Sequence, residues 1–407
     1  FEAIMEARTK ERTYTWKALK SYQPEKYPSH SIRLLASELN YVYADELILD
    51  VAEDLRRDDT IQAVGVLDDD DHVIGAVIRE DFFARLSRPF AQDLYKNRIV
   101  REITTGVEVM SSDENVFTVA EAIDEQLKDQ STTFYLLANE ERSFHGLFST
   151  QDMLIYLSDI TQEDISLART LQSRIVRERD LVVGERFEFA SASLSAKGVG
   201  GDFYNIRKYA DGRWVVALCD VSGKGVAASI VTSVLWGMMS IYDFRRGLGA
   251  FLRELNRYIM TTFEAEKFVT AVFLDYNEED STIQICDLGH SHLFLHRGGR
   301  FGKLRNKHGN LPLGVVPELD PKLSLFRPTD DDVLLLLTDG LIEQPDAAGS
   351  EYSVDRVATL INDNAAQPVE SIADRLISDF QRFKGRRHLH DDMTFAIIKF
   401  TPQEVTL

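Results

Sequence analysis

The sequence predicts a multidomain α+β protein, in which an internally repeated N-terminal region is joined by a helix to a C-terminal region of antiparallel strands. The chain has 407 residues, 44% of them hydrophobic, which is more than one domain usually holds. Residues 31–158 contain two copies of one strand, turn, strand and helix pattern. From residue 184 onward, alternating strands, hairpin turns and two helices replace that repeat.

The composition excludes two classes of partner. A formal net charge of −20 repels the phosphate backbone of nucleic acids and the anionic membrane surface. No apolar run approaches the roughly 18 residues of a membrane-spanning helix. The two cysteines, Cys219 and Cys286, lie in apolar runs without metal-ligand spacing, so we expect buried thiols and a reducing cytoplasm.

The first region begins with a polar segment, residues 1–30, to which we assign no function. Beyond it, IQAVGVLDDDDHVIGAVIREDFFARLS at 61–87 matches TTFYLLANEERSFHGLFSTQDMLIYLS at 132–158. Gly75 aligns with Gly146, and Asp81 aligns with Asp152. A helix precedes each copy, at 45–57 and 116–129. We read the acidic run 68–71 as a solvated turn between two strands, and a calcium site as the alternative.

This repeat, residues 31–158, resembles a tandem pair of cystathionine-beta-synthase (CBS) domains, a family whose paired modules often bind adenine nucleotides. The family's ribose-binding pattern is a glycine, a hydroxyl residue three positions on and an aspartate three further. Gly146, Ser149 and Asp152 meet it in the second copy, whereas the first copy keeps Asp81 but has Ile78 at the hydroxyl position. The resemblance implies at most one good nucleotide site, and a pair that only dimerises is the alternative.

Residues 159–183 form the predicted connection. Ile165, Ala168 and Ile175 recur at helical spacing, with charged residues on the other faces, so we expect a linker helix. Its place between two folded regions suggests a dimerisation and signalling element, and we expect a homodimer.

The C-terminal region, residues 184–407, contains a strong hairpin signal at Asp211 and Gly212, an Asp-Gly turn between two strand-like runs. If Ala210 pairs with Arg213, two acidic residues come together at the open end of the hairpin. The resulting register pairs Asp202 with Val221 and Phe203 with Asp220.

Two further aspartates lie at strand ends. Asp339 ends the run VLLLLT, and Asp391 precedes the strand MTFAIIKF. If these strands are antiparallel neighbours, Asp339 and Asp391 share an edge. Clustered carboxylates repel one another, and divalent cations relieve that repulsion. An all-oxygen site favours magnesium or manganese, and two such ions about 4 Å apart can activate a water for attack on phosphorus.

Six segments occur in the order and spacing of the SpoIIE-like branch of the PPM metal-dependent protein phosphatases. They are GVGGDFYN, CDVSGKGVAAS, DLGH, LPLGV, LLLLTDGLIEQ and HDDMTF. The resemblance covers about residues 165–402 and implies an α-β-β-α sandwich of two antiparallel sheets. Asn205 stands where the family usually has Asp, and His292 stands near a usual Pro.

The resemblance also implies ligand roles. Asp220 takes the position that bridges two Mn²⁺ or Mg²⁺ ions, with the Val221 carbonyl on one of them. Asp202 takes the second-metal position, and Asp339 and Asp391 take the first-metal positions. The implied substrate is a phosphoserine or phosphothreonine protein, such as an anti-sigma-factor antagonist of bacterial signalling.

Three other functions compete with this one. A catalytically silent, CBS-regulated scaffold would bind phosphoprotein without hydrolysing it. A nucleotide-hydrolysing enzyme would need a phosphate loop, but Leu218 and Gly225 break the Walker pattern around GKG. A cysteine phosphatase is excluded, because no anion-binding loop ending in Arg follows either cysteine.

Overall fold

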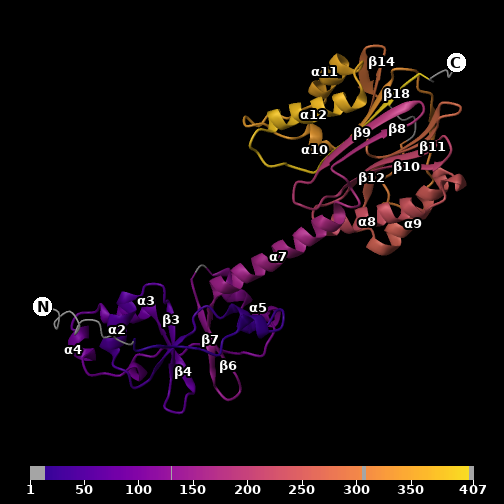
Figure 1. The fold of residues 1–407 in the computed structure, drawn as a ribbon. Coiled ribbons are helices and arrows are strands. Elements are labelled where there is room, and N and C mark those ends of the chain that lie inside the picture. Colours follow the sequence, from indigo (N-terminus) through magenta and orange to yellow (C-terminus); the bar gives the residue numbers. More distant parts are fainter. Residues whose placement is uncertain (1–13, 130, 305–308, 403–407) are drawn as a thin grey trace, which may run out of the picture. The chain divides into compact units, whose positions relative to one another are not determined.

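The structure is a computed structural model that describes residues 14–129, 131–304 and 309–402. The chain divides into two compact units, residues 1–162 and 163–407, and the boundary falls inside helix α7 (Figure 1). Part of the predicted N-terminal segment 1–30 lies outside the described residues. Lys17–Ala18 (β1) pairs with Asn40–Tyr43 (β2), so the first sheet begins earlier than residue 31. No described helix is both long and apolar enough to cross a membrane.

The N-terminal unit contains the repeat that the sequence predicts. In each copy one strand pairs in parallel with a second, which pairs in antiparallel with a third, and the same bulge interrupts both hairpins. The first copy comprises β2, α2 (Ile48–Arg57), β3 (Ala63–Leu67), β4 (Val73–Ile78), α3 (Arg79–Leu86) and the short α4 (Ala91–Tyr95). The second comprises β5 (Val109–Ser111), α5 (Val116–Ala122), α6 (Asp124–Lys128), β6 (Phe134–Ala138), β7 (Phe144–Ser149) and the start of α7 (Thr150–Gln172).

The acidic run lies at the exposed turn between β3 and β4. One Asp68 carboxylate oxygen accepts hydrogen bonds from the backbone N–H groups of Asp70 and His72, which closes the turn locally. In the described part of the chain, these are the one set of three or more His, Cys, Asp or Glu side chains whose ligand atoms all lie within 4.8 Å of one another. Because Asp68 already caps the turn, the solvated-turn interpretation accounts for this cluster without a metal.

The linker helix differs from its predicted range of 159–183. Helix α7 begins at Thr150, directly after β7, and ends at Gln172. Residues 179–183 form the edge strand β8 (Arg179–Val183), which pairs with β9 (Phe187–Leu194). The helical spacing of Ile165, Ala168 and Ile175 does not extend to these residues, which pair with β9 as a strand.

The C-terminal unit is built from two antiparallel sheets. One has the strand order β10-β11-β12-β13-β16, and the other β15-β14-β17-β18-β9-β8. The strands of the first are β10 (Asp202–Ala210), β11 (Arg213–Val221), β12 (Val269–Asn277), β13 (Thr282–Leu288) and β16 (Ser324–Phe326). The second adds β14 (Leu293–Arg297), β15 (Arg300–Lys303), β17 (Val333–Leu337) and β18 (Met393–Phe400) to β8 and β9.

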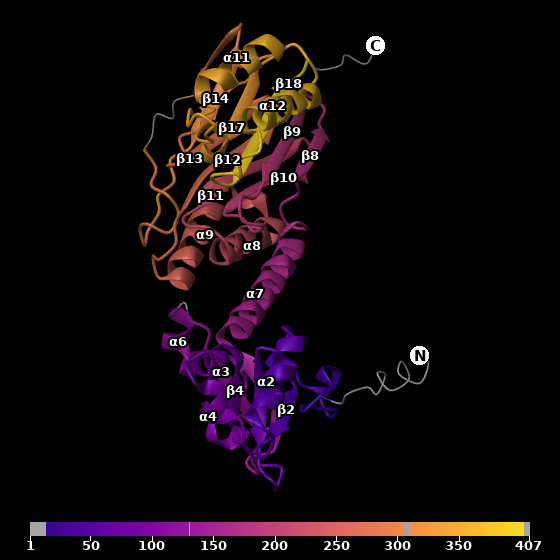
Figure 2. The same cartoon turned by 90° about the vertical axis from the view of Figure 1, so that its left-hand side faces the viewer.

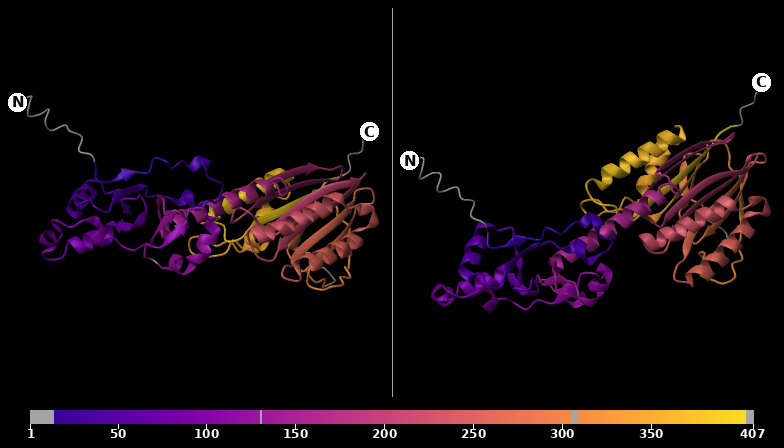
Figure 3. Two further views of the ribbon diagram at one scale, coloured as in Figure 1. Left: turned by 90° about the horizontal axis from the view of Figure 1, so that it is seen from below. Right: turned by 60° about the horizontal axis from the view of Figure 1, so that its bottom comes forward.

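Helices cover the outer face of each sheet. Figures 2 and 3 show α8 (Val226–Ile241) and α9 (Leu248–Phe263) on one side of the paired sheets, and α11 (Val354–Asn364) and α12 (Val369–Lys384) on the other. Three buried clusters follow this layering. One joins α8 and α9 to the five-stranded sheet, one joins α11 and α12 to the six-stranded sheet, and one lies between the sheets. The unit is therefore the predicted α-β-β-α sandwich.

The predicted hairpin register is wrong by one residue. Ala210 does pair with Arg213, but a bulge at Tyr209 follows, and Lys208 pairs with Trp214. The Tyr209 ring packs near Phe244, with 5.6 Å between ring centroids, and its hydroxyl donates to Asp275 at 2.7 Å. These contacts hold the extra residue out of the ladder. As a result, Asp202 lies directly opposite Asp220.

Candidate active site

Asp202 and Asp220 share the face of the hairpin that points between the two sheets. Side chains alternate along a strand, so each aspartate lies on the same side as the residue two positions away. Those residues are Tyr204 and Leu218, and both belong to the cluster between the sheets. Two carboxylates therefore occupy neighbouring positions at one end of the apolar interior.

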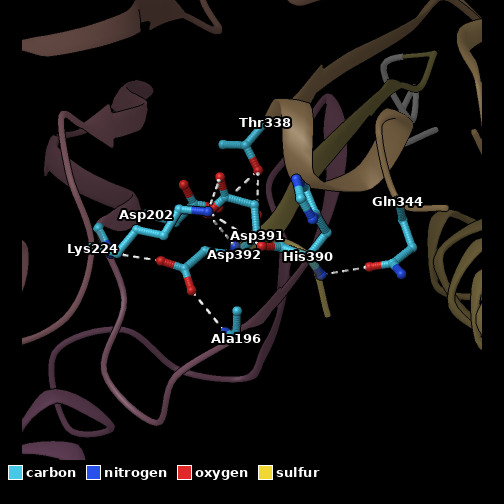
Figure 4. Close-up of polar contacts among 9 residues, drawn as sticks. Ala196, Asp202, Lys224, Thr338, Gln344, His390, Asp391 and Asp392 are labelled. Carbon is cyan, nitrogen blue, oxygen red and sulfur yellow. Dashed lines mark hydrogen bonds and ion pairs between the residues drawn. The ribbon is translucent and has the colours of Figure 1, made fainter. Parts of the chain in front are cut away.

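Asp202 is the more deeply buried of the pair, with 5% of its surface exposed. The Thr338 hydroxyl donates to Asp202 Oδ2 at 2.8 Å (Figure 4). Burial, together with the charges of Asp220 and Asp392, raises the pKa of Asp202 well above its usual range. The side-chain hydrogen bonds from Thr394 and Thr338 lower the pKa of Asp202 but do not offset the effect of burial, so a bound cation would favour its ionised form.

Asp220 is half-buried and faces the other carboxylates. Burial raises its pKa to about 7, and the negative charges of Asp339 and Asp391 add to the effect. The ammonium group of Lys224 opposes it. Asp220 is therefore electrostatically coupled to both of the aspartates that the sequence places at the other strand ends.

Asp339 and Asp391 come from neighbouring strands, as predicted. β17 and β18 pair in antiparallel, so the end of one adjoins the start of the other. Asp339 is the first residue of the short helix α10 (Asp339–Ile342). The backbone at Gly340 lies so close to Asp392 that a Cβ atom on Gly340 would be 1.9 Å from the Asp392 carbonyl oxygen. Close backbone approach explains the glycine after Asp339.

Lys224 supplies a positive charge that the sequence argument did not assign. Its ammonium lies 2.8 Å from Asp391 Oδ2 and donates to the His390 carbonyl at 3.2 Å. The residue belongs to the segment CDVSGKG, where the glycines drew attention to a phosphate loop and away from the lysine. No local pattern indicates this contact, because Asp391 lies far along the chain from Lys224.

Asp392 organises the loop before Asp202 and lies beside the cluster of four aspartates. Its two carboxylate oxygens accept the backbone N–H groups of Ala196, at 2.8 Å, and of Gly201, at 2.7 Å. A Cβ at Gly200 would lie 2.7 Å from Asp392 Oδ2, so this approach requires glycine. Gln172, the last residue of α7, braces the same loop by donating to the Gly200 carbonyl at 2.7 Å and accepting its N–H at 2.9 Å.

His290 supports the same region from within the sandwich. Its Nε2–H donates to the Leu337 carbonyl at 2.8 Å, and its Nδ1 accepts from the Thr270 hydroxyl at 3.1 Å. Burial lowers the pKa of His290 to about 4, so the ring is neutral at pH 7. Both ring nitrogens are occupied, and His290 therefore positions strand ends.

The aspartate cluster fits divalent cations by its chemistry. Asp202, Asp220, Asp339 and Asp391 offer only carboxylate oxygens, which hard cations prefer. Asp202 and Asp220 have raised pKa values because burial and repulsion from neighbouring carboxylates are only partly offset by Lys224, Thr394 and Thr338. A set of buried carboxylates with unbalanced charge is the arrangement that bound cations stabilise.

The residues predicted for nucleotide binding lie in the N-terminal unit and do not face one hollow. The Asp152 carboxylate accepts the hydroxyls of Ser149, at 2.6 Å, and Ser37, at 2.8 Å, as well as the Ser149 N–H. The hydroxyl and carboxylate expected to bind ribose are thus bonded to each other. Asp81 instead lines a hollow of about 290 Å³ with Thr105, Thr133 and other residues.

Comparison with known proteins agrees with this geometry. Residues 210–401 match the family model described as "Stage II sporulation protein E (SpoIIE)". Phosphoserine phosphatase RsbP of Bacillus subtilis is 24% identical over 245 residues, covering 58% of each chain. Phosphoserine phosphatase RsbU of the same organism is 26% identical over 282 residues, which cover 64% of this chain and 80% of RsbU. The chain thus spans less than two thirds of RsbP.

A solved structure shows the same fold. The SiaA-PP2C domain of Pseudomonas aeruginosa superimposes with a TM-score of 0.50 and 19% identity, over 60% of this chain and 98% of that domain. At this identity the likeness concerns the fold alone. The family match over residues 210–401 falls within the same unit, so the C-terminal unit is similar in sequence to the SpoIIE family and similar in fold to a PP2C phosphatase domain.

Proposed function

We propose that this protein is a metal-dependent serine/threonine protein phosphatase, and that Asp202, Asp220, Asp339 and Asp391 form its active site. The observation that carries the proposal is the meeting of buried and half-buried carboxylates from β10, β11, α10 and the start of β18 at one end of the sandwich. A fold does not need such a cluster, because repulsion among the carboxylates destabilises it.

Each side chain has a proposed task in holding two Mn²⁺ or Mg²⁺ ions. Asp220 would contact both ions and the Val221 carbonyl one of them, while Asp202 would hold the second ion, and Asp339 and Asp391 the first. Bound ions of this type supply a hydroxide at neutral pH and screen the oxygens of a phosphoryl group. Thr338 orients Asp202 for this task, and Lys224 offsets charge at Asp391.

The proposed substrate is a phosphoserine or phosphothreonine protein of bacterial signalling. RsbP and RsbU, which resemble this chain, are both named phosphoserine phosphatases. We infer a substrate like an anti-sigma-factor antagonist and a cytoplasmic location. The two cysteines support a cytoplasmic location, because free thiols are typical of a reducing compartment. Both are free and buried, as the sequence predicts. Burial raises the pKa of the Cys286 thiol to about 12.

Hydrolysis of p-nitrophenyl phosphate and of a phosphoserine peptide, with and without Mn²⁺, tests the proposed activity. The intact chain should release phosphate only with the metal, and Asp339→Asn should lower the rate by at least about a hundredfold. Asp211→Asn, at the solvent-exposed hairpin turn, is the matched control and should retain full activity. A folded chain that binds phosphoprotein but releases no phosphate at any metal concentration would establish the scaffold instead.

We further propose that the N-terminal unit is a regulatory CBS pair that binds an adenine nucleotide and takes part in a homodimer. The duplicated strand and helix pattern, with the same bulge in both hairpins, supports the pair. The hollow at Asp81 supports a ligand there, whereas the mutual bonds of Ser149 and Asp152 favour a structural role for the second copy.

Titration calorimetry with ATP, ADP and AMP separates these assignments. If the nucleotide binds at the hollow, Asp81→Ala should weaken binding by about tenfold or more, and Asp152→Ala should not. Loss of binding in Ser149→Ala/Asp152→Ala alone would place the ligand in the second copy. Absence of binding to the intact chain would leave dimerisation as the role of the pair.

A further inference from the structure

A second feature of the active-site end is a hollow of about 440 Å³ in the C-terminal unit. Asp202 and Asp392 form part of its wall. The rest comes from the last turns of α7, from the loop after β9 and from the loop between α12 and β18. Five basic side chains line it, and we call it the basic hollow: Arg169, Lys384, Arg386, Arg387 and His388.

The charge of the basic hollow contrasts with that of the chain, which is −20 overall. Among the residues the structure describes, no ion pair joins these four lysine and arginine side chains to a carboxylate, although Lys384 and Arg387 donate to backbone carbonyls. Glu178 is the one acidic residue in the wall besides Asp202 and Asp392. Cations without a carboxylate partner, gathered in a concave surface, attract an anionic ligand more strongly than the same charges dispersed.

The loop that carries three of these residues is held in place by its own contacts. The buried Gln344 accepts the His390 N–H at 3.0 Å and donates to the His388 carbonyl at 3.3 Å (Figure 4 shows the first bond). Lys384 donates to the Arg387 carbonyl at 2.7 Å, and Arg387 donates to the Ala347 carbonyl at 3.1 Å. These bonds pre-organise the backbone, which lowers the cost of ordering it on binding.

We propose that the basic hollow binds acidic residues that flank the phosphorylated serine or threonine of the protein substrate. This inference rests on the proposed function. A phosphoryl group at Asp202 lies at the wall of the hollow, and an extended chain advances about 3.3 Å per residue. Neighbours of the phosphorylated residue therefore reach Arg386 and Arg387 within a few positions. Elsewhere the acidic chain repels an acidic substrate, so the hollow also sets its orientation.

Two phosphoserine peptides of equal length, one with three flanking Glu residues and one with Gln in their place, test the inference. With the intact chain and Mn²⁺, we expect kcat/KM to favour the Glu peptide by about three- to tenfold at low salt. The preference should fall towards one in about 0.5 M NaCl, because salt screens exposed charges.

Substitutions in the basic hollow test which residues cause the preference for the Glu peptide. Arg386→Gln/Arg387→Gln should lower it to about one, while the rate with p-nitrophenyl phosphate changes by less than about twofold. Arg169→Gln, which changes a residue of α7 instead, should also lower the preference for the Glu peptide. The control, Arg375→Gln/Arg382→Gln, removes equal charge from α12 beside a different hollow and should keep the preference.

Three results would overturn the inference while leaving the proposed activity intact. These are equal rates for the two peptides with the parent chain, an unchanged preference in Arg386→Gln/Arg387→Gln, and an equal loss in the control. A parent chain that hydrolyses neither peptide nor p-nitrophenyl phosphate with metal would remove the proposed activity, and this inference with it.

Discussion

At the scale of single residues, Thr338 shows how an acidic site is held inside a hydrophobic sandwich. Its hydroxyl donates to Asp202 and also accepts the Thr394 N–H at 3.0 Å, so one buried side chain joins β18 to β10. Thr338 has no exposed surface, so no water can replace either of these hydrogen bonds.

Thr338→Val should therefore weaken both stability and metal binding. The variant leaves the Thr394 N–H and an Asp202 oxygen unpaired, at a cost of about 1–3 kcal/mol, and we expect roughly ten- to a hundredfold weaker Mn²⁺ activation. Thr338→Ser keeps the hydroxyl and should lie near the parent. Thermal unfolding and Mn²⁺ titration of p-nitrophenyl phosphate hydrolysis measure the two effects. A fully active Thr338→Val would show that Asp202 needs no such orientation.

Asp220 gives the metal-free protein a defined pH dependence. Its pKa is about 7 in the fold against an ordinary 3.8, so the folded state holds a proton that the unfolded chain has released between these values. The unfolding free energy should therefore fall as pH rises from about 4 to 7, by about 2–4 kcal/mol for this group. Mn²⁺ should reverse the loss above pH 7.

Asp220→Asn removes the ionisation and tests that assignment. In EDTA, this variant should be more stable than the parent at pH 8, with a smaller change between pH 5 and pH 8. Urea unfolding of the C-terminal unit at both pH values measures this. The same pH slope in the variant and the parent would show that other carboxylates carry the effect.

At the scale of elements, strand pairing brings the aspartates together, and much of that could be predicted from sequence. The Asp-Gly turn predicted the hairpin, and the two apolar runs that flank Asp339 and Asp391 predicted antiparallel neighbours; the structure has both. The bulge at Tyr209 could not be predicted, because it depends on contacts with Phe244 and Asp275 from distant parts of the chain. Local turn chemistry sets the hairpin, and tertiary packing sets its register.

Side chains that act on the site through the backbone were also missed. Gln172 reads as one more position on a helix, and nothing in its neighbourhood predicts two bonds to Gly200, 28 residues away. Asp392 lies directly beside Asp391 in the sequence, and only the structure shows that its carboxylate holds the loop before Asp202. Such roles depend on which segments fold together, so residue type alone does not reveal them.

The end of α7 should therefore influence catalysis without touching the aspartates. Gln172→Ala breaks both bonds to Gly200 and the bond to Thr232, which frees the loop that positions Asp202. We expect about a tenfold lower kcat with p-nitrophenyl phosphate and less change in the unfolding midpoint than Thr338→Val causes. Thr170→Ala, on an exposed face of the same helix, is the control. Equal activities in both variants would contradict a role for this contact.

At the scale of the whole molecule, the sequence predicts the N-terminal repeat better than it predicts the connection between the two units. The two copies share one pattern of apolar and polar residues at the same spacing. That pattern predicted the same order of strands and helix in each copy. The end of the linker was predicted wrongly, since residues 179–183 complete a sheet whose other strands lie far along the sequence. The boundary between the units lies within α7, so one helix belongs to both.

Two exposed leucines on α7 predict where a second copy of the chain binds. Leu167 and Leu171, one turn apart, expose 60% and 53% of their surfaces, and a solvated helix gains little from such residues. If a second copy covers them in the proposed homodimer, Leu167→Ser/Leu171→Ser should shift the chain from dimer to monomer in analytical ultracentrifugation. Leu181→Ser/Val183→Ser, which removes two comparably exposed side chains from β8, is the matched control and should not. Because α7 ends at Gln172, a dimer formed there would place the contact between copies beside the loop that positions Asp202. Dimers that persist in the α7 variant would assign the interface to another surface.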